Sequence, residues 1–196
     1  MIRELLIILV ILFFPTLVQA DPPRGLLPDA IAELQYKMLV DINPHDIDAR
    51  NKLGMALLRE NKLQEAENQF AEVLRQAPRD FDAHDGMGLV KIKQRDFPAA
   101  LSWIQKAISL SETDTMARFH LGLVYEYSGR FREAEIAYNQ ALAVNDRNMR
   151  IAIRLNHTPE GLNRKIIKDT LQNFKMMHSH AIFRDSTKGK EAGHVP

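Results

Sequence analysis

Apolar residues between positions 29 and 148 recur three or four apart, and short polar segments interrupt the pattern. This spacing puts the apolar side chains of each segment on one face of a helix. The predicted turns are Asn61–Lys62, Arg95–Asp96 and Gly129–Arg130. The predicted helices lie near residues 29–42, 48–60, 64–76, 82–94, 98–109, 115–128 and 132–144. The pattern therefore predicts an all-α chain built from antiparallel helix pairs.

The helix pairs repeat with a period of 34, which is the interval from Gly54 to Gly88. Glycine inside a helix costs about 1 kcal/mol relative to alanine, so glycines in register indicate places where two helix backbones approach closely. We expect alanines on the second helices to face them, with bulky residues filling the space towards the next repeat. The columns are Gly54, Gly88 and Gly122; Ala66, Ala100 and Ala134; and Phe70, Ile104 and Tyr138.

These columns resemble the tetratricopeptide repeat family from about Asp29 to Asn148. The matching residues are Leu53, Gly54, Ala66, Phe70 and Pro78; Gly88, Ala100 and Ala107; and Leu121, Gly122, Tyr125, Ala134, Tyr138 and Ala141. The chain departs from the family's early bulky column, and from its tyrosine column in two repeats. The departures are Arg50, His84 and Arg118 in the first column, and Leu57 and Lys91 in the second.

The resemblance implies a right-handed α-solenoid of antiparallel helix pairs, because one repeat alone cannot bury both faces of its helices. Three full repeats are expected at residues 47–80, 81–114 and 115–148. Residues 29–46 would supply the second helix of a repeat whose first helix is absent, as an N-terminal half-repeat.

In this family the first helices of successive repeats line a concave groove that takes a peptide or a partner helix. The residues expected to face the groove are Asn51, Met55, Leu58, Asp85, Leu89, Ile92, Met116, Phe119, Leu123 and Tyr127. The set has an apolar floor and polar edges, which suits an amphipathic helix or an extended apolar peptide. The alternative is that part of the stripe packs inside the domain beneath the C-terminal helix. Asn51 and Met55 stand where a subfamily that grips C-terminal carboxylates has lysine and asparagine, which argues against that ligand class.

The repeat pattern stops after Asn148. A short helix is expected at residues 149–156, and Thr158 and Pro159 then give the N-cap and first position of a helix reaching about Met177. Residues 149–178 are expected to cap the solenoid. The alternatives are a partner-binding helix and a basic helix lying on a membrane surface. Residues 179–196 are polar and glycine-containing and are expected to form a flexible tail.

The N-terminal segment, residues 1–20, differs from the rest of the chain. Leu5 to Phe14 is an unbroken apolar run, and Val18 and Ala20 place small residues at the spacing that signal peptidase accepts. We expect residues 1–20 to be a signal peptide cleaved after Ala20 and residues 21–28 to be a linker. Export, most simply to a bacterial periplasm, follows. The alternative is an uncleaved inner-membrane anchor, because Glu4 weakens the basic start.

Composition narrows the chemistry further. The chain has no cysteine, which excludes disulfides and thiolate sites, and its seven histidines lack the paired helical spacing of a metal site. We therefore expect no metal, no cofactor and no enzyme activity. The net charge of +1 combines a mildly acidic body with a basic segment after Arg147. That segment lacks the interleaved aromatic residues typical of nucleic-acid binding, so no nucleic-acid partner is expected.

The sequence thus predicts a non-catalytic scaffold or adaptor for a protein or peptide partner in a cell-envelope assembly. Two alternatives stay open. One is a membrane-tethered subunit whose basic C-terminal helix contacts lipid peripherally. The other is a homo-oligomer formed by repeats that stack head to tail.

Overall fold

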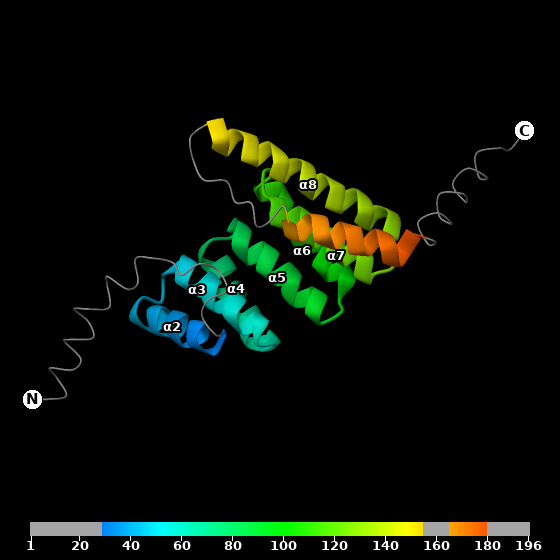
Figure 1. Ribbon diagram of the computed structural model, residues 1–196. Helices are drawn as coiled ribbons and strands as arrows, with labels where there is room; N and C mark the ends of the chain where they lie inside the picture. Colours follow the sequence, from blue (N-terminus) through cyan, green and yellow to red (C-terminus); the bar gives the residue numbers. More distant parts are fainter. Residues whose placement is uncertain (1–28, 155–164, 180–196) are drawn as a thin grey trace, which may run out of the picture.

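The computed structural model describes residues 29–154 and 165–179, and within these ranges every regular element is a helix (Figure 1). The predicted signal peptide, linker and most of the tail lie outside the described residues. The helices are α2 (Asp29–Ile42), α3 (Ile47–Arg59), α4 (Leu63–Gln76), α5 (Phe81–Lys93), α6 (Phe97–Leu110), α7 (Thr115–Tyr127) and α8 (Phe131–Arg154), followed by a helix at residues 165–179.

The helices form the predicted solenoid. Helices α3 and α4, α5 and α6, and α7 and α8 form antiparallel pairs, and each pair packs on the next, with α2 packed against α3. Figure 1 shows the array running from α2 at one end to α8 and the helix at residues 165–179 at the other. The prediction of a tetratricopeptide-like α-solenoid is confirmed.

The glycine columns mark close contacts between helices, as expected. A Cβ atom on Gly54 would lie 2.7 Å from the ring of Phe70, and one on Gly122 would lie 2.4 Å from the ring of Tyr138. A side chain at either position would hold the two helices apart. Gly86, which sequence analysis overlooked, makes the same kind of contact, since its Cβ would lie 2.4 Å from Phe70 of the preceding repeat. Phe70 therefore fills the space between α3 and α5.

Aspartates one period apart cap the first helices. The carboxylate of Asp46 accepts from the backbone N–H of the third residue after it at 2.9 Å, and those of Asp80 and Asp114 do so at 2.8 Å. Each satisfies a donor that the first turn of a helix leaves unpaired. The turns inside the repeats are also in register, because all three contain a residue with left-handed backbone, namely Asn61 (φ 61°), Arg95 (φ 62°) and Gly129 (φ 77°). The caps and the turns therefore recur at the same places in all three repeats.

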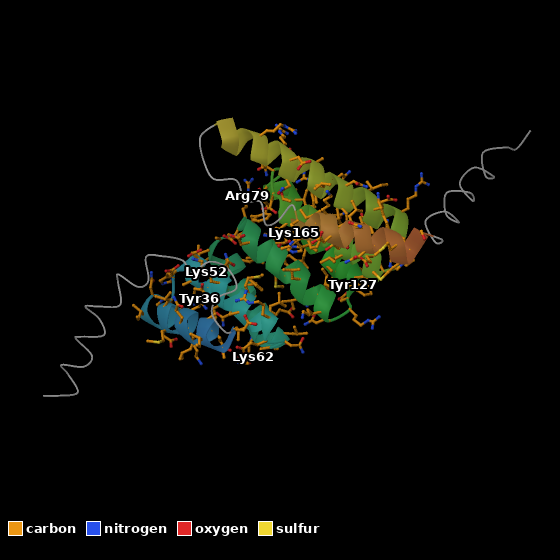
Figure 2. The ribbon with its side chains drawn as sticks, viewed as in Figure 1. Tyr36, Lys52, Lys62, Arg79, Tyr127 and Lys165 are labelled. Atoms are coloured by element: carbon orange, nitrogen blue, oxygen red, sulfur yellow. The ribbon has the colours of Figure 1, made fainter. Side chains whose placement is uncertain are left out.

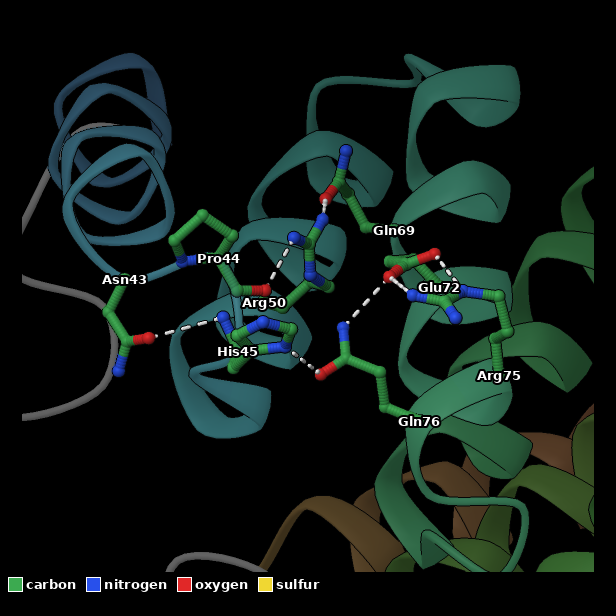
Figure 3. A network of polar contacts seen from close by, with 8 residues as sticks. All are labelled: Asn43, Pro44, His45, Arg50, Gln69, Glu72, Arg75 and Gln76. Carbon is green, nitrogen blue, oxygen red and sulfur yellow. Dashed lines mark hydrogen bonds and ion pairs between the residues drawn. The ribbon is translucent and has the colours of Figure 1, made fainter.

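Arg50, His84 and Arg118, which replace the bulky residues of the family's first column, each contact a backbone carbonyl oxygen in or next to the preceding loop. Arg50 donates to the carbonyl oxygen of Pro44 at 2.8 Å and to Oε1 of Gln69 at 2.9 Å, joining the α2–α3 loop to α4 (Figure 3). His84 Nδ1 lies 2.7 Å from the carbonyl oxygen of Asp80, and Arg118 donates to the carbonyl oxygen of Asp114 at 3.0 Å. All three residues of this column thus make hydrogen bonds, and the ring of His84 also packs against that of Trp103, with the ring centroids 5.5 Å apart.

The C-terminal part differs from the prediction in one respect. Helix α8 continues without a break from Phe131 to Arg154, so the expected helix end near Val144 and the separate helix at residues 149–156 are wrong. Asn148 lies inside α8. Its side-chain amide donates to the carbonyl oxygen of Thr113, which ties α8 to the preceding repeat. Thr158 and Pro159 lie outside the described residues.

Candidate functional site

A hollow of about 480 Å³ opens where α3, α5 and α7 lie side by side, near their C-terminal ends. It lies on the first helices of the three repeats, which the sequence predicted to form the groove. The lining residues are Leu58, Leu89, Ile92, Lys93, Arg95, Phe97, Leu123 and Tyr127. Most of this surface is apolar, and the two cations and the exposed Tyr127 supply polar atoms for orienting a ligand.

Half of the ten predicted groove residues line this hollow, namely Leu58, Leu89, Ile92, Leu123 and Tyr127. They come from three different helices, so the repeat packing brings them together. Residues that recur 34 apart, such as Leu89 and Leu123, share one column of the groove. The family resemblance selected these columns, and the period of 34 carried them from one repeat to the next.

The other five predicted groove residues lie elsewhere. Met55, Asp85 and Met116 are half-buried and do not line the hollow. Asn51 is buried and donates to the carboxylate of Asp80 at 2.9 Å, so it serves the contact between the first two repeats. Phe119 is also buried, with its ring 5.5 Å from that of Tyr138, in a cluster that includes the helix at residues 165–179. For Phe119 the alternative, packing beneath the C-terminal helix, is correct.

The two ends of the groove differ in charge. At the N-terminal ends of the first helices, partial burial and then the neighbouring carboxylates of Asp80, Asp85 and Asp114 raise the pKa of Asp82. At the opposite end, Lys93 and Arg95 are exposed at the rim of the hollow. A bound segment would therefore meet negative potential at one end and positive potential at the other.

A buried ion pair joins α5 to α7. His120 Nδ1 lies 2.8 Å and 2.9 Å from the two carboxylate oxygens of Asp85. Burial alone would lower the pKa of His120, but the charge of Asp85 and the hydrogen bond to it outweigh burial and raise that pKa. The pair fixes the contact between the second and third repeats. Sequence analysis missed this pair, because it assigned Asp85 to the groove and nothing in the sequence connects Asp85 with His120.

Sequence profiles of the tetratricopeptide repeat match residues 51–115 and 116–148, which together make up half of the chain. The chain belongs to the tetratricopeptide repeat family.

Solved structures agree with this assignment. MamA is 19% identical, with 81% of this chain and 89% of that chain covered and a TM-score of 0.51. A thermophilic tetratricopeptide repeat protein from Thermus thermophilus is 16% identical, with 74% and 90% covered and a TM-score of 0.56. At these identities the likeness shows the fold alone. A search of curated proteins finds no significant match.

The tetratricopeptide repeat geometry explains the helix at residues 165–179. Between the first and second repeats, Lys91 on a first helix pairs with Glu67 on the preceding second helix at 2.7 Å. Lys175 pairs at 3.0 Å with Glu135, which stands two periods after Glu67. The apolar face of this helix is buried through Ile167, Leu171 and Phe174. The helix therefore takes the place of the first helix of a fourth tetratricopeptide repeat.

This equivalence adds a residue that sequence analysis missed. Met176 follows Lys175 as Ile92 follows Lys91, so Met176 takes the position that Leu58, Ile92 and Glu126 hold in the three full repeats. It is 68% exposed. The sequence hid this relation because the interval from Lys91 to Lys175 is longer than two periods. The added residues include the extended end of α8.

Two further searches concern the described residues alone. No three side chains of histidine, aspartate or glutamate in residues 29–154 and 165–179 gather closely enough to hold a metal ion. None of the helices in these ranges is both long and apolar enough to cross a membrane.

Proposed function

We propose that this tetratricopeptide repeat protein is a non-catalytic scaffold or adaptor that binds a helix or an extended apolar peptide across α3, α5 and α7. The observation that carries the proposal is the hollow to which all three full repeats contribute apolar side chains. Leu89 and Leu123 form its floor, and Tyr127, 55% exposed, stands at its edge. A large aromatic side chain beside an apolar hollow is a typical anchor for a protein partner.

The charged residues at the rim of the hollow indicate which kind of partner would bind. Lys93 and Arg95 favour a segment that carries a carboxylate beside its apolar anchors. Met176 and Met177 on the helix at residues 165–179 are exposed beyond the third repeat and supply flexible apolar surface. An amphipathic helix with leucine or phenylalanine anchors and an acidic end fits both features.

We further propose that the chain acts outside the cytoplasm, in a cell-envelope assembly, after cleavage following Ala20. Support comes from the apolar run Leu5 to Phe14 and the small residues Val18 and Ala20. N-terminal sequencing of the protein purified from cells that express the full chain tests this. A chain that starts at Asp21 supports cleavage, whereas an intact Met1 supports the membrane-tethered alternative.

Paired substitutions to glutamate test the groove. Tyr127→Glu combined with Lys93→Glu changes two rim residues whose loss opens no cavity in the core. We expect this variant to lose at least tenfold of its affinity for the natural partner, identified by capture from the envelope fraction and then purified. Ile136→Glu combined with Lys106→Glu is the matched control, because both residues are exposed on second helices outside the hollow. Equal loss in both variants, or full binding by the groove variant, would refute the proposal, provided that circular dichroism shows unchanged folding.

A further inference from the structure

Helix α2, at one end of the array, has an exposed apolar stripe. Ile31, Leu34, Met38 and Ile42 are 51%, 61%, 42% and 79% exposed. Their spacing of three, four and four residues puts them on one side of the helix over three turns. Together they present roughly 400 Å² of surface, the size at which an apolar patch on a soluble protein usually has a function.

The other second helices do not share this stripe. One period later, the corresponding residues of α4 are all polar, namely Glu65, Asn68, Glu72 and Gln76. In α6, two of the four are Ser102 and Lys106, both exposed. In α8, Ile136 is exposed, but Glu133 and Gln140 stand on either side of it in the same columns. The continuous stripe is therefore a feature of α2 itself and not of the repeat.

A first helix before α2, placed as α3 is beside α4, would not cover the stripe. Asn68 and Ser102 remain exposed although the first helices of their repeats are present. Such a helix would cover a different face of α2. Tyr36 and Leu39 are only half-buried, whereas their counterparts in α4 are fully buried, namely Phe70 and Val73. Within residues 29–154 and 165–179, the stripe is therefore left without a covering helix.

The charge of α2 argues against a lipid surface as that partner. The helix carries three carboxylates and one cation, Lys37. Arg59 and Lys62 from the neighbouring repeat pair with two of the carboxylates, and the third, Asp41, remains exposed beside the stripe. An anionic bilayer attracts cationic, not acidic, amphipathic helices. A protein surface is the better match.

We propose that the stripe binds the same stripe of a second copy, with the two α2 helices antiparallel about a twofold axis at Met38. In this register each Met38 faces its counterpart, and Leu34 of one copy lies opposite Ile42 of the other. The partner's α2 then covers Leu34, Met38 and Ile42 in each copy, whereas Ile31 lies past the end of the partner's helix, opposite the loop that follows it. A twofold pairing is closed, because each copy uses the same surface once.

Charge supports this register. Lys37 and Asp41 lie on the same edge of the stripe. On an ideal helix, with about 100° per residue, Lys37 is about 100° and Asp41 about 60° around the axis from Met38, both in the same direction. Across the twofold axis, the edges that face one another are the same edge of each helix. Lys37 of one copy and Asp41 of the other copy are then offset by only about 3 Å along the helix axis. Symmetry gives two such ion pairs.

The area sets the strength of the pairing. Leu34, Met38 and Ile42 present roughly 300 Å² per copy, which is less than half of what a stable interface buries on each partner. We therefore expect a reversible dimer whose population depends on protein concentration. Figure 2 shows Tyr36 and Lys62 at this end of the array and Lys165 and Tyr127 towards the other, so the dimer leaves the groove free.

The experiment uses protein purified from cells that express the full chain. Sedimentation is expected to show a monomer–dimer equilibrium, and Leu34→Glu is expected to abolish the dimer without changing the circular dichroism. Lys37→Glu is expected to weaken dimerisation at least tenfold, and adding Asp41→Lys to restore it. Asn68→Glu, at the corresponding exposed position of α4, is the matched control and should dimerise normally.

Absence of cysteine allows a second measurement. Met38→Cys places a single thiol on the twofold axis, and mild oxidation is expected to give a covalent dimer. Lys106→Cys, at the same position of α6, should stay monomeric. Monomers at every concentration, species larger than a dimer, or equal cross-linking of both variants would each overturn the proposal. Flotation of the protein with vesicles of phosphatidylglycerol and phosphatidylethanolamine, if abolished by Leu34→Glu, would identify lipid as the occupant and would also overturn it.

Discussion

Gly88→Ala tests the close contact between α5 and α6 on which the repeat depends. A Cβ atom at this position would lie 2.4 Å from Cγ1 and 3.0 Å from Cδ1 of Ile104. It would also lie 3.5 Å from the backbone nitrogen of Ile104, which leaves little room for the isoleucine to retreat. Ile104 is completely buried, so its rotation is restricted by neighbours on all sides.

Two effects of opposite sign decide the result. Replacing a helix-interior glycine by alanine stabilises a helix by about 1 kcal/mol when the site is open. Overpacking a closed interior costs about 1–3 kcal/mol. Since Cγ1 is bonded to the Cβ of Ile104 and cannot swing away freely, α6 itself must move. We expect a net loss of about 1–2 kcal/mol in the free energy of unfolding.

Urea denaturation provides the measurement, followed by far-ultraviolet circular dichroism and by the fluorescence of Trp103, the only tryptophan. A double-mutant cycle identifies the cause. Ile104→Ala alone should cost about 3 kcal/mol, because it leaves a cavity. In the Ile104→Ala background, Gly88→Ala should be neutral or stabilising by about 1 kcal/mol. Stabilisation by Gly88→Ala alone, or equal destabilisation in both backgrounds, would refute the argument.

Two further predictions concern the turns and the buried ion pair. Arg95→Gly should stabilise the protein by about 0.5–1 kcal/mol in urea denaturation, because Arg95 holds φ 62° where Gly129 serves the third repeat; no gain would contradict a backbone cause. The second prediction follows from the raised pKa of His120 in the folded protein. Its pairing with Asp85 stabilises the folded state fully below the unfolded pKa of about 6.5, and this stabilisation is lost as the pH rises through the folded pKa. From about pH 6 to about pH 9, the wild type should lose more unfolding free energy than Asp85→Asn. Parallel pH profiles would contradict this.

Much of the fold could be predicted because the residues that determine helix packing recur at the same positions in each repeat. Glycine at residues 54, 88 and 122 is costly in a helix unless two backbones meet, and each of these positions does meet a bulky residue of the second helix. The groove was predicted less completely. Leu89 and Leu123 follow directly from the period, whereas Phe119, in an equivalent first helix, is buried by a helix that the period does not predict.

The sequence by itself determined the period, the helix pairing and the columns that pack, because these depend on residues close together in the chain. Tertiary structure alone decided three features that depend on residues far apart. One is the place of the helix at residues 165–179, which Lys175 and Glu135 reveal. Another is the contact of His120 with Asp85. The third is which apolar residues stay exposed, because burial depends on neighbours that a single helix does not contain. The stripe on α2 was visible in the sequence as an ordinary apolar face, and only the structure shows that no helix of the described residues covers it.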